Sequence, residues 1–462
     1  MTDIADLSAA AMLEAYAART LSPVEVAEAV IARIEAWEPK LCALWAYDPD
    51  AARTQAQASE QRWRRDEALP LDGVPCTIKE NVATRGTPVP LGTAARELVP
   101  AEADAPPAAR LRDAGCVLLA KTTMPDYGML SSGLSSFHKL ARNPWNLAKN
   151  PGGSSAGAGA AAAVGYGPLH LGTDIGGSIR LPAGWCGVVG LKPSFGRVPI
   201  DPAYYGRVAG PMTRDVTDTA LMMRELSKPD TRDGMSLPPQ QIDWLALDID
   251  PRGLRIGLQM EAGLGLPLDE EVRQAIADAA ARFAAAGAIV EEVPPCLTRE
   301  MLDGLDDFWR QRAWADIGAL EPREQDKVLR YIFDWAKGGE NLSGERVYRG
   351  MSRMQEIRDA SLKQIAGFDL VISPVSPVPS FSAELASPID DPKRPFEHIV
   401  YTVAANMSDQ PSTAVPAAMT SSGLPIGLQI TGRRFDDLGV LRAARLWEQL
   451  RAPLPDWPTS SQ

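Results

Sequence analysis

Between residues 71 and 191 the sequence consists of short apolar runs that are separated by glycine and proline. The clearest runs are VPCTI at 74–78, CVLLA at 116–120, LHLGT at 169–173 and CGVVGL at 186–191. Runs of this length without regular polar alternation are typical of strands that are covered on both faces of a sheet. We therefore expect these strands to form the centre of the fold, with other elements packed on either side.

Glycine is concentrated in the middle of this region. Twelve of the 38 glycines fall between Pro151 and Gly190, and the Ala-rich run 156–164 is long enough for a helix. Because glycine has no side chain, such a helix can approach its neighbours closely. The composition of this segment thus predicts tight packing around a central turn-rich stretch.

The first 65 residues predict a helical layer. Ser22, Pro23 and Glu25 have the spacing of a helix start, with serine as the cap, proline at the first position and glutamate closing a capping box. Apolar residues then recur at helical spacing at Val26, Val30, Ile34 and Trp37. One face of this helix is expected to pack onto the rest of the protein.

The pattern loosens after this region. Residues 226–250 carry proline, aspartate and glycine without periodicity, which predicts a linker or a long surface loop. Beyond it the sequence predicts strands at 254–259, 288–293, 370–372 and 426–430, and helices at 269–286, over most of 301–366 and at 437–451. The strand–helix–strand order at 254–293 indicates that the sheet continues, although a second lobe could also begin there.

The overall charge limits the expected partners. The 462 residues carry a formal net charge of −12, so the surface field repels phosphate backbones and anionic lipids. No stretch approaches the roughly 20 apolar residues that a membrane-spanning helix needs, and the first ten residues lack the segments of a signal peptide. We therefore expect a cytoplasmic protein that has neither nucleic acid nor a membrane as a partner.

The sequence has few residues of the types that bind metals or form disulfides. Five cysteines, an odd number, lie at least 34 residues apart, and we expect them to be small buried apolar residues. The three histidines, His138, His170 and His398, form no HExxH motif and no other close pair. The sequence therefore predicts an activity without a metal or another cofactor.

Two serine-rich turns are candidates for a nucleophile. Residues 153–157 match the GxSxG pattern and precede His398, which is the chain order of an α/β-hydrolase triad, but this pattern is common in Gly/Ser/Ala-rich sequence. Residues 172–180 follow an expected strand and place two glycines directly before Ser178. These glycines could form an oxyanion hole, or the turn could instead cap a helix and bind an anion.

A serine nucleophile needs a base, and lysine is a candidate because histidine is scarce. Lys79 follows an apolar run, so burial of its stem could keep its amine neutral. A lone lysine is more often a solvated surface charge. The residues by themselves leave both interpretations open.

Taken together, three segments resemble the amidase signature family. GVPCTIKEN at 73–81 resembles its lysine motif, PGGSSAGAGAA at 151–161 its serine-rich loop, and GTDIGGSIRLPAGWCGVVGLKPSFGRVP at 172–199 the signature itself. NPWN at 143–146, the GPM segment at 210–212, FDLVISP at 368–374 and GLPIGLQITGR at 423–433 extend the similarity over nearly the whole chain. The resemblance implies an α/β fold of three layers, α/β/α, in which helices cover a large twisted mixed β-sheet.

The resemblance also implies a single catalytic domain with three parts. Residues 1–65 form the N-terminal helical layer, residues 66–225 the signature core with the catalytic triad, and residues 226–462 the remainder of the same domain. The last part is expected to include the variable helices of the substrate pocket.

Residue by residue, the resemblance implies a Ser-Ser-Lys triad. Ser178 matches the nucleophile, Ser154 the bridging serine that is usually held by a cis peptide, and Lys79 the base. A neutral Lys79 at pH 7 requires its pKa to fall by roughly 3 units through burial. The family's oxyanion hole corresponds to the backbone N–H groups of Ile175, Gly176, Gly177 and Ser178. Its supporting positions correspond to Ser155, Thr173, Asp174 and Arg180.

The substrate pocket is less constrained by the resemblance. The serine-rich loop reads SSAGAG where SSGGS is common, and Thr123 stands where asparagine is common, so the pocket geometry stays open. The expected pocket segment consists of Tyr127, Gly128, Met129, Leu130, Ser131 and Ser132. Six further aromatic residues either wall the site or, as we favour, belong to ordinary helical packing: Phe308, Trp309, Trp314, Tyr331, Phe333 and Trp335.

The implied activity is hydrolysis of a carboxylic amide through an acyl-enzyme on Ser178. Aryl amides, carbamates (urethanes) and esters are candidate small-molecule substrates, a urea- or biuret-type amide is an alternative, and the enzyme could form a homodimer. A catalytically inactive binding protein on the same fold and the amidase subunit of a tRNA-dependent amidotransferase are two further alternatives. The latter is disfavoured because residues 204–211 lack an SLDQ-like stretch and the signature reads TDIGG rather than SDTGG.

Overall fold

A single mixed β-sheet runs through the protein in a computed structural model that describes residues 3–460. Within these residues it has 11 strands in the order β1-β3-β2-β4-β6-β5-β10-β11-β9-β7-β8. The strands are β1 (Leu44–Trp45), β2 (Pro75–Lys79), β3 (Val117–Thr122), β4 (Leu169–Asp174), β5 (Val189–Lys192), β6 (Val208–Thr213), β7 (Arg255–Leu258), β8 (Ile289–Glu292), β9 (Leu370–Pro374), β10 (Ser412–Met419) and β11 (Pro425–Gly432).

Parallel pairing of β2 with β4 brings two sequence motifs together. The register pairs Thr77 with His170 and Ile78 with Leu171, so both strands end at the same edge of the sheet. Strand β2 also pairs in parallel with β3, whereas β4 pairs antiparallel with β6. Lys79 at the end of β2 and Asp174 at the end of β4 are thereby placed beside each other, although 95 residues separate them in sequence.

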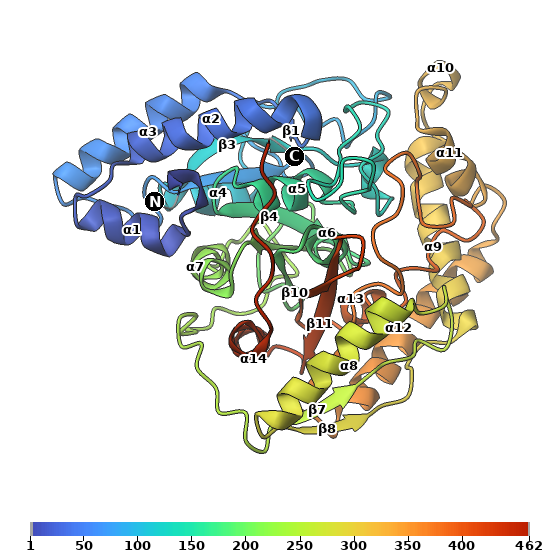
Figure 1. The fold of residues 1–462 in the computed structure, drawn as a ribbon. Helices are drawn as coiled ribbons and strands as arrows, with labels where there is room; N and C mark the ends of the chain where they lie inside the picture. Colours follow the sequence, from blue (N-terminus) through green and yellow to red (C-terminus); the bar gives the residue numbers. More distant parts are fainter. Residues whose placement is uncertain (1–2, 461–462) are drawn as a thin grey trace.

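Helices cover both faces of this sheet (Figure 1). Helices α5 and α6 pack on one face, and α7, α8 and α14 pack on the other. The α-helices are α1 (Ala9–Ala17), α2 (Pro23–Leu41), α3 (Pro49–Arg64), α4 (Pro106–Asp113), α5 (Ala156–Val164), α6 (Arg180–Cys186), α7 (Val216–Leu226), α8 (Glu270–Ala285), α9 (Arg299–Ile317), α10 (Pro322–Gln325), α11 (Arg330–Lys337), α12 (Gly344–Ile365), α13 (Val403–Met407) and α14 (Asp437–Leu450). This arrangement confirms the expected α/β/α fold.

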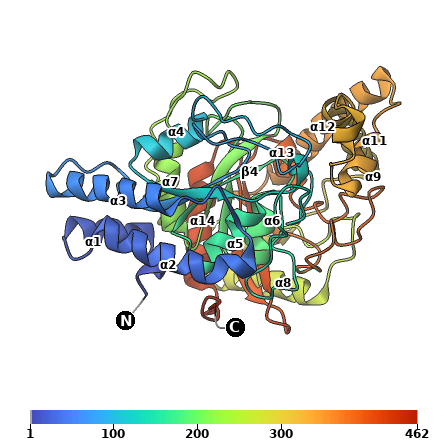
Figure 2. The same ribbon diagram turned by 90° about the horizontal axis from the view of Figure 1, so that it is seen from above.

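The helices outside the two covering layers lie at opposite sides of the molecule. Helices α1–α3 flank the end of the sheet that carries β1 and β3, and α9, α11 and α12 pack together on the far side (Figure 2). No helix among residues 3–460 is both long enough and apolar enough to cross a membrane.

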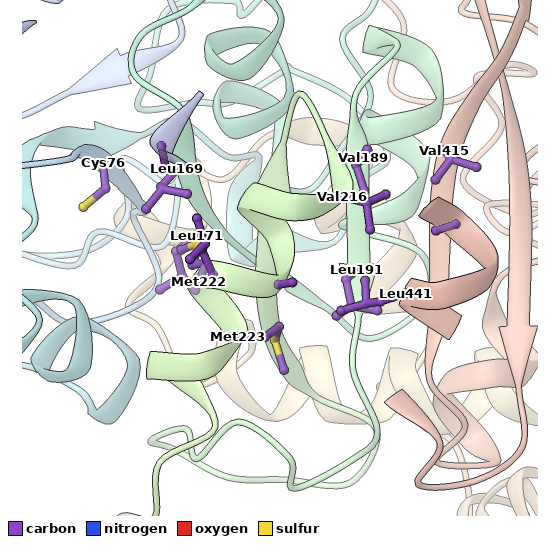
Figure 3. Close-up of a cluster of buried hydrophobic side chains, with 14 of the residues drawn as sticks. Cys76, Leu169, Leu171, Val189, Leu191, Val216, Met222, Met223, Val415 and Leu441 are labelled. Carbon is purple, nitrogen blue, oxygen red and sulfur yellow. The ribbon is translucent and has the colours of Figure 1, made fainter. Parts of the chain in front are cut away.

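The hydrophobic core between the sheet and α7 shows why the apolar runs form strands (Figure 3). Leu169 and Leu171 of β4 point to this face and are fully buried together with Val216 and Met222 of α7. Because side chains alternate along a strand, Gly172, which follows Leu171, faces the opposite side, where a Cβ would lie 2.9 Å from the hydroxyl of Ser155 at the start of α5. Full burial of each leucine or valine stabilises the fold by roughly 1.5–3 kcal/mol.

Most of the secondary structure that the sequence predicts is present. Helix α2 begins at a capping box formed by Ser22 and Glu25, and α5, α8 and α14 match the predicted helices to within one or two residues. The stretch between α7 and β7 contains neither a helix nor a strand, as expected for a long loop. The sequence analysis missed β1, β6 and β10; the last two contain Pro211 and Pro416, which interrupt the strand pattern.

The expectation for the cysteines is only partly correct. Cys76, Cys116 and Cys186 are buried, but Cys42 and Cys296 are only partly buried. Cys42 caps the C-terminal end of α2 with a positive φ of 53°, where the chain leaves the helix and approaches the surface. All five are free thiols.

Candidate active site

Lys79 contacts the serine-rich loop at the ends of β2 and β4. Its Nζ lies 2.7 Å from Ser154 Oγ, 3.1 Å from Ser155 Oγ and 3.4 Å from the carbonyl oxygen of Thr173. The side chain is fully buried, because β2 is covered on both faces. The sequence did not decide whether Lys79 is buried or a solvated surface charge. The structure shows that it is an interior residue.

Burial changes the charge state of Lys79. Its pKa falls to about 7, chiefly because desolvation penalises the ammonium form. The negative charge of Asp174 opposes this shift, whereas the positive charge of Arg207 reinforces it. A substantial fraction of Lys79 is thus neutral at physiological pH and able to accept a proton.

Ser154 is held between Lys79 and Gly128. The peptide bond between Gly153 and Ser154 is cis. A side chain at Gly128 would place its Cβ only 3.3 Å from Ser154 Oγ, so the glycine leaves room for the hydroxyl. Ser155, at the start of α5, exchanges hydrogen bonds with the backbone N–H and carbonyl of Thr173 at 3.2 and 3.1 Å, which fixes the loop against β4.

The turn after β4 is organised by the carboxylate of Asp174. It accepts hydrogen bonds from the N–H groups of Gly177 at 2.8 Å and Ile179 at 3.0 Å, and it pairs with Arg180 at 3.0 Å. Burial raises the pKa of Asp174, but Arg180 outweighs this effect and holds the pKa well below its usual range. Asn406 in α13 donates to the same carboxylate, so residues from distant segments hold the turn in place.

Several N–H groups of this turn have no hydrogen-bond partner among the described residues. Within residues 3–460 no protein group accepts a hydrogen bond from the N–H of Ile175, Gly176 or Ser178. The N–H of Gly177, also assigned to the oxyanion hole on sequence grounds, instead donates to Asp174. Three N–H groups are therefore available to a substrate oxygen, and the fourth stabilises the turn.

A pocket opens directly onto Ser154 and Ser178. Five of the six residues in the expected pocket segment line it, whereas Ser132 is buried and bonded to Asn150 and Leu385. The lining residues that the sequence analysis did not assign to the pocket are Asn81, Tyr204, Arg207, Arg312, Ala386, Ser387, Pro395, Phe396, His398 and Ile399. One signal could have pointed to Arg312: it follows Trp309 by three residues on a predicted helix, which places both on one face.

The aromatic cluster at 308–335 is divided between the pocket and the core. Trp309 lines the pocket. Trp335 packs edge-on against Phe396, and Trp314 packs against Phe333, with ring centroids 5.9 Å apart in both pairs. Core packing thus accounts for most of the cluster, as favoured from the sequence, and Trp309 is its contribution to the site.

The contacts of His398 do not resemble those of an α/β-hydrolase base. Its ring stacks on Trp185, and its buried Nε2 has no hydrogen-bond partner within residues 3–460. The serine of the GxSxG pattern, Ser155, bonds to Lys79 and Thr173 instead. His398 does line the pocket, which its position in the sequence did not indicate.

Comparisons with known proteins agree with this geometry. A family model described as Amidase matches residues 25–441. Among curated relatives, the A subunit of the glutamyl-tRNA(Gln) amidotransferase of Anaeromyxobacter dehalogenans (strain 2CP-C) is 34% identical over 483 residues, covering 96% of each chain.

Two solved structures have the same fold over almost the entire chain. A bacterial aryl acylamidase of the amidase signature family has a TM-score of 0.87 and 30% identity, covering 96% of both chains. The 6-aminohexanoate cyclic dimer hydrolase has a TM-score of 0.87 and 27% identity, covering 100% of this chain and 99% of the other. The protein therefore belongs to the amidase signature family and is an amide-hydrolysing enzyme.

Proposed function

We propose that the protein cleaves its amide substrate through an acyl-enzyme on Ser178, with Ser154 and Lys79 as a proton relay. The observation that carries this proposal is the 2.7 Å contact between Ser154 Oγ and the Nζ of a fully buried Lys79. A lysine with a pKa of about 7 is matched to accept a proton at neutral pH and return it later. Ser178 is partly exposed to the pocket and thus accessible to a substrate.

The acylation step follows from this arrangement. Neutral Lys79 takes the proton of Ser154 while Ser154 takes the proton of Ser178, whose Oγ forms a bond to the amide carbon. The negative charge that develops on the carbonyl oxygen is stabilised by the N–H groups of Ile175, Gly176 and Ser178. The C–N bond then breaks, and the departing nitrogen receives a proton from Ser154, which is restored by Lys79.

Deacylation uses the same proton relay, with water as the attacking group and Ser178 as the leaving group. A water molecule gives up a proton through Ser154 to Lys79 and attacks the ester carbon of the acyl-enzyme. The second tetrahedral intermediate collapses, Ser178 regains its proton, and the carboxylic acid leaves. Each N–H donor aimed at the oxyanion is worth roughly 100-fold or more in rate, so the turn after β4 is central to both steps.

The pocket walls favour a substrate with an apolar or aromatic part. Tyr127, Trp309 and Phe396 contribute aromatic surface, and Met129 and Ile399 add aliphatic surface. The structural similarity to an aryl acylamidase supports aryl amides, and carbamates or esters of similar shape would present the same carbonyl to Ser178. A small urea- or biuret-type substrate would leave most of this apolar surface unfilled.

The relatives that are named amidotransferase subunits favour a second candidate function, release of ammonia from glutamine inside a complex. Glutamine carries an ammonium group that needs an acidic partner. Among the described residues that line the pocket, Asp174 supplies the sole carboxylate, and it is already paired with Arg180. A free-standing amidohydrolase therefore fits the pocket better.

Covalent labelling would test the proposed nucleophile. Wild-type protein and Ser178→Ala would be treated with a fluorophosphonate and analysed by intact mass spectrometry. We expect one adduct on the wild type and none on the variant. Labelling that persists in Ser178→Ala, especially at Ser155, would contradict the mechanism.

An activity assay would distinguish the two candidate functions. The purified chain alone, without ATP or tRNA, is expected to hydrolyse aryl amides and to release little ammonia from glutamine. Glutamine hydrolysis that appears only when partner proteins are added would favour the amidotransferase function instead. Ser178→Ala serves as the background control in both assays.

A further inference from the structure

Two arginines line the pocket without an acidic partner. Arg207, one residue before β6, and Arg312 in α9 both lie against the ring of Tyr204, with their guanidinium carbons 5.2 and 4.0 Å from the ring centroid. Neither forms an ion pair within 4.0 Å with any residue in the described range 3–460. Two positive charges are therefore held around one aromatic side chain at the wall of the site.

Arg207 is buried and has hydrogen-bonding capacity to spare. Its side chain donates to the carbonyl oxygens of Pro202 at 2.6 Å and Asn81 at 3.2 Å, which uses two of the five N–H groups of a guanidinium. Its Nε is buried and has no partner among the described residues. Burial and the nearby charge of Arg312 lower the pKa of Arg207, which indicates that the protein itself compensates this cation poorly.

Arg312 is available to a ligand in a different way. It makes no hydrogen bond to any residue in the part of the chain that the structure describes, and its side chain is only partly buried. Asp174, which also lines the pocket, does not neutralise the pair because it is paired with Arg180, and Asp201 acts on Arg207 electrostatically without forming an ion pair. The pocket therefore has an excess of positive charge although the whole chain is acidic.

We propose that the substrate is an amide that also carries a carboxylate, and that Arg207 and Arg312 bind this carboxylate while Ser178 attacks the amide carbonyl. Guanidinium groups bind carboxylates through short charge-assisted hydrogen bonds, and unpaired donors at the edge of an apolar pocket are suited to this task. The inference rests on the proposed function and names its substrate class. Aromatic walls and a cationic wall in one pocket select an acid that also has an apolar part.

Binding can be tested without catalysis. Ser178→Ala protein would be titrated calorimetrically with malonate, succinate, glutarate and adipate, and with the matching neutral diamides. A series of chain lengths is used because the length that fits is set by the distance between the two arginines and the nucleophile. We expect at least one diacid to bind roughly tenfold or more tightly than its diamide. Equal or absent binding of all diacids would overturn the proposal.

A matched pair of variants assigns the effect to the pocket. Arg312→Gln in the Ser178→Ala background is expected to lose the preference for the diacid, whereas Arg323→Gln removes the same charge from an 84% exposed site and should retain it. Arg312→Lys should restore part of the binding. A diacid preference that survives in Arg312→Gln would show that the anion binds elsewhere and would contradict the proposal.

Kinetics on active protein separate this inference from the proposed function. Anilides of succinate and glutarate would be compared with the uncharged butyryl and valeryl anilides. The kcat/KM for a charged anilide divided by that for its uncharged counterpart is expected to fall roughly tenfold or more in Arg312→Gln. Uncharged anilides that are cleaved as efficiently as the charged ones, with Ser178 still labelled, would overturn the inference alone. Diacid binding without any labelling of Ser178 would instead overturn the proposed mechanism.

Discussion

At the scale of single residues, the activity depends on the protonation of Lys79. Burial lowers its pKa to about 7, so the amine is mostly protonated below this pH and mostly neutral above it. Because the relay needs the neutral form, kcat/KM is expected to rise with pH and to reach half its plateau near pH 7. At pH 5 it should be roughly 100-fold below the plateau. The reason is that pH 5 lies two units below this pKa, and the neutral fraction of the amine falls tenfold for each unit.

The pH profile is measured with one aryl amide between pH 5 and pH 9. His398→Asn is the control: burial lowers the pKa of His398 to about 4, so its removal should alter KM but leave the midpoint in place. Arg207→Gln should move the midpoint upward, because the charge of Arg207 lowers the pKa of Lys79. A kcat/KM that does not change between pH 5 and pH 9 would mean that Lys79 is not the base.

At the scale of elements, the turn between β4 and α6 connects the fold to the chemistry. Gly177 has a φ of +126°, a conformation that L side chains rarely adopt, and a Cβ there would lie 2.5 Å from Thr402 Oγ1. Gly177→Ala must therefore shift the turn and the N–H groups of its neighbours. We expect kcat to fall roughly 100-fold, comparable to the loss of one oxyanion donor.

Gly423→Ala is the matched control for this prediction. Gly423 also has a positive φ, of +77°, but a Cβ at this position would meet no atom within 4 Å, and the residue belongs to the hairpin turn between β10 and β11. This variant should cost about 1 kcal/mol of stability and leave kcat unchanged. If Gly177→Ala kept full activity while remaining folded, the N–H groups of this turn would not be the oxyanion donors.

At the scale of the whole molecule, the sheet and its core connect the two ends of the chain. The larger hydrophobic cluster includes residues from Ala5 to Trp447, and β10 and β11 lie between β5 and β9. A buried ion pair between Arg197 and Asp437 also links the segment after β5 to α14. These connections support the proposal that residues 1–65, 66–225 and 226–462 form one domain.

A single domain should unfold as one unit. In urea, far-UV circular dichroism and tryptophan fluorescence are expected to report the same midpoint. Asp437→Asn should lower the free energy of unfolding by several kcal/mol, because it leaves Arg197 buried without its partner, but it should not split the transition. Two separate transitions, one for each half of the sequence, would contradict the single-domain proposal.

Much of this protein could be predicted from local sequence. The helix start at Ser22 depends on contacts within a few residues, and the apolar runs of the strands follow a local pattern; both are present in the structure. Strands β6 and β10 were missed because glycine and proline obscure their pattern, and their partners in the sheet and the covering helices stabilise them. The resemblance of three motifs identified the family, and it also pointed to Lys79 and Ser154, which lie 75 residues apart.

The sequence by itself thus determined the family, the layered fold and the contact between Lys79 and Ser154. Only the tertiary structure decided the state of those residues. The pKa of Lys79 depends on desolvation by strands and helices that are distant in sequence, and the N–H of Gly177 is committed to Asp174 because α6 and α13 hold that carboxylate in place. The placement of Arg207 and Arg312 around Tyr204 likewise requires α9 to approach the loop before β6, because the charge of a pocket depends on residues that are neighbours in space and not in sequence.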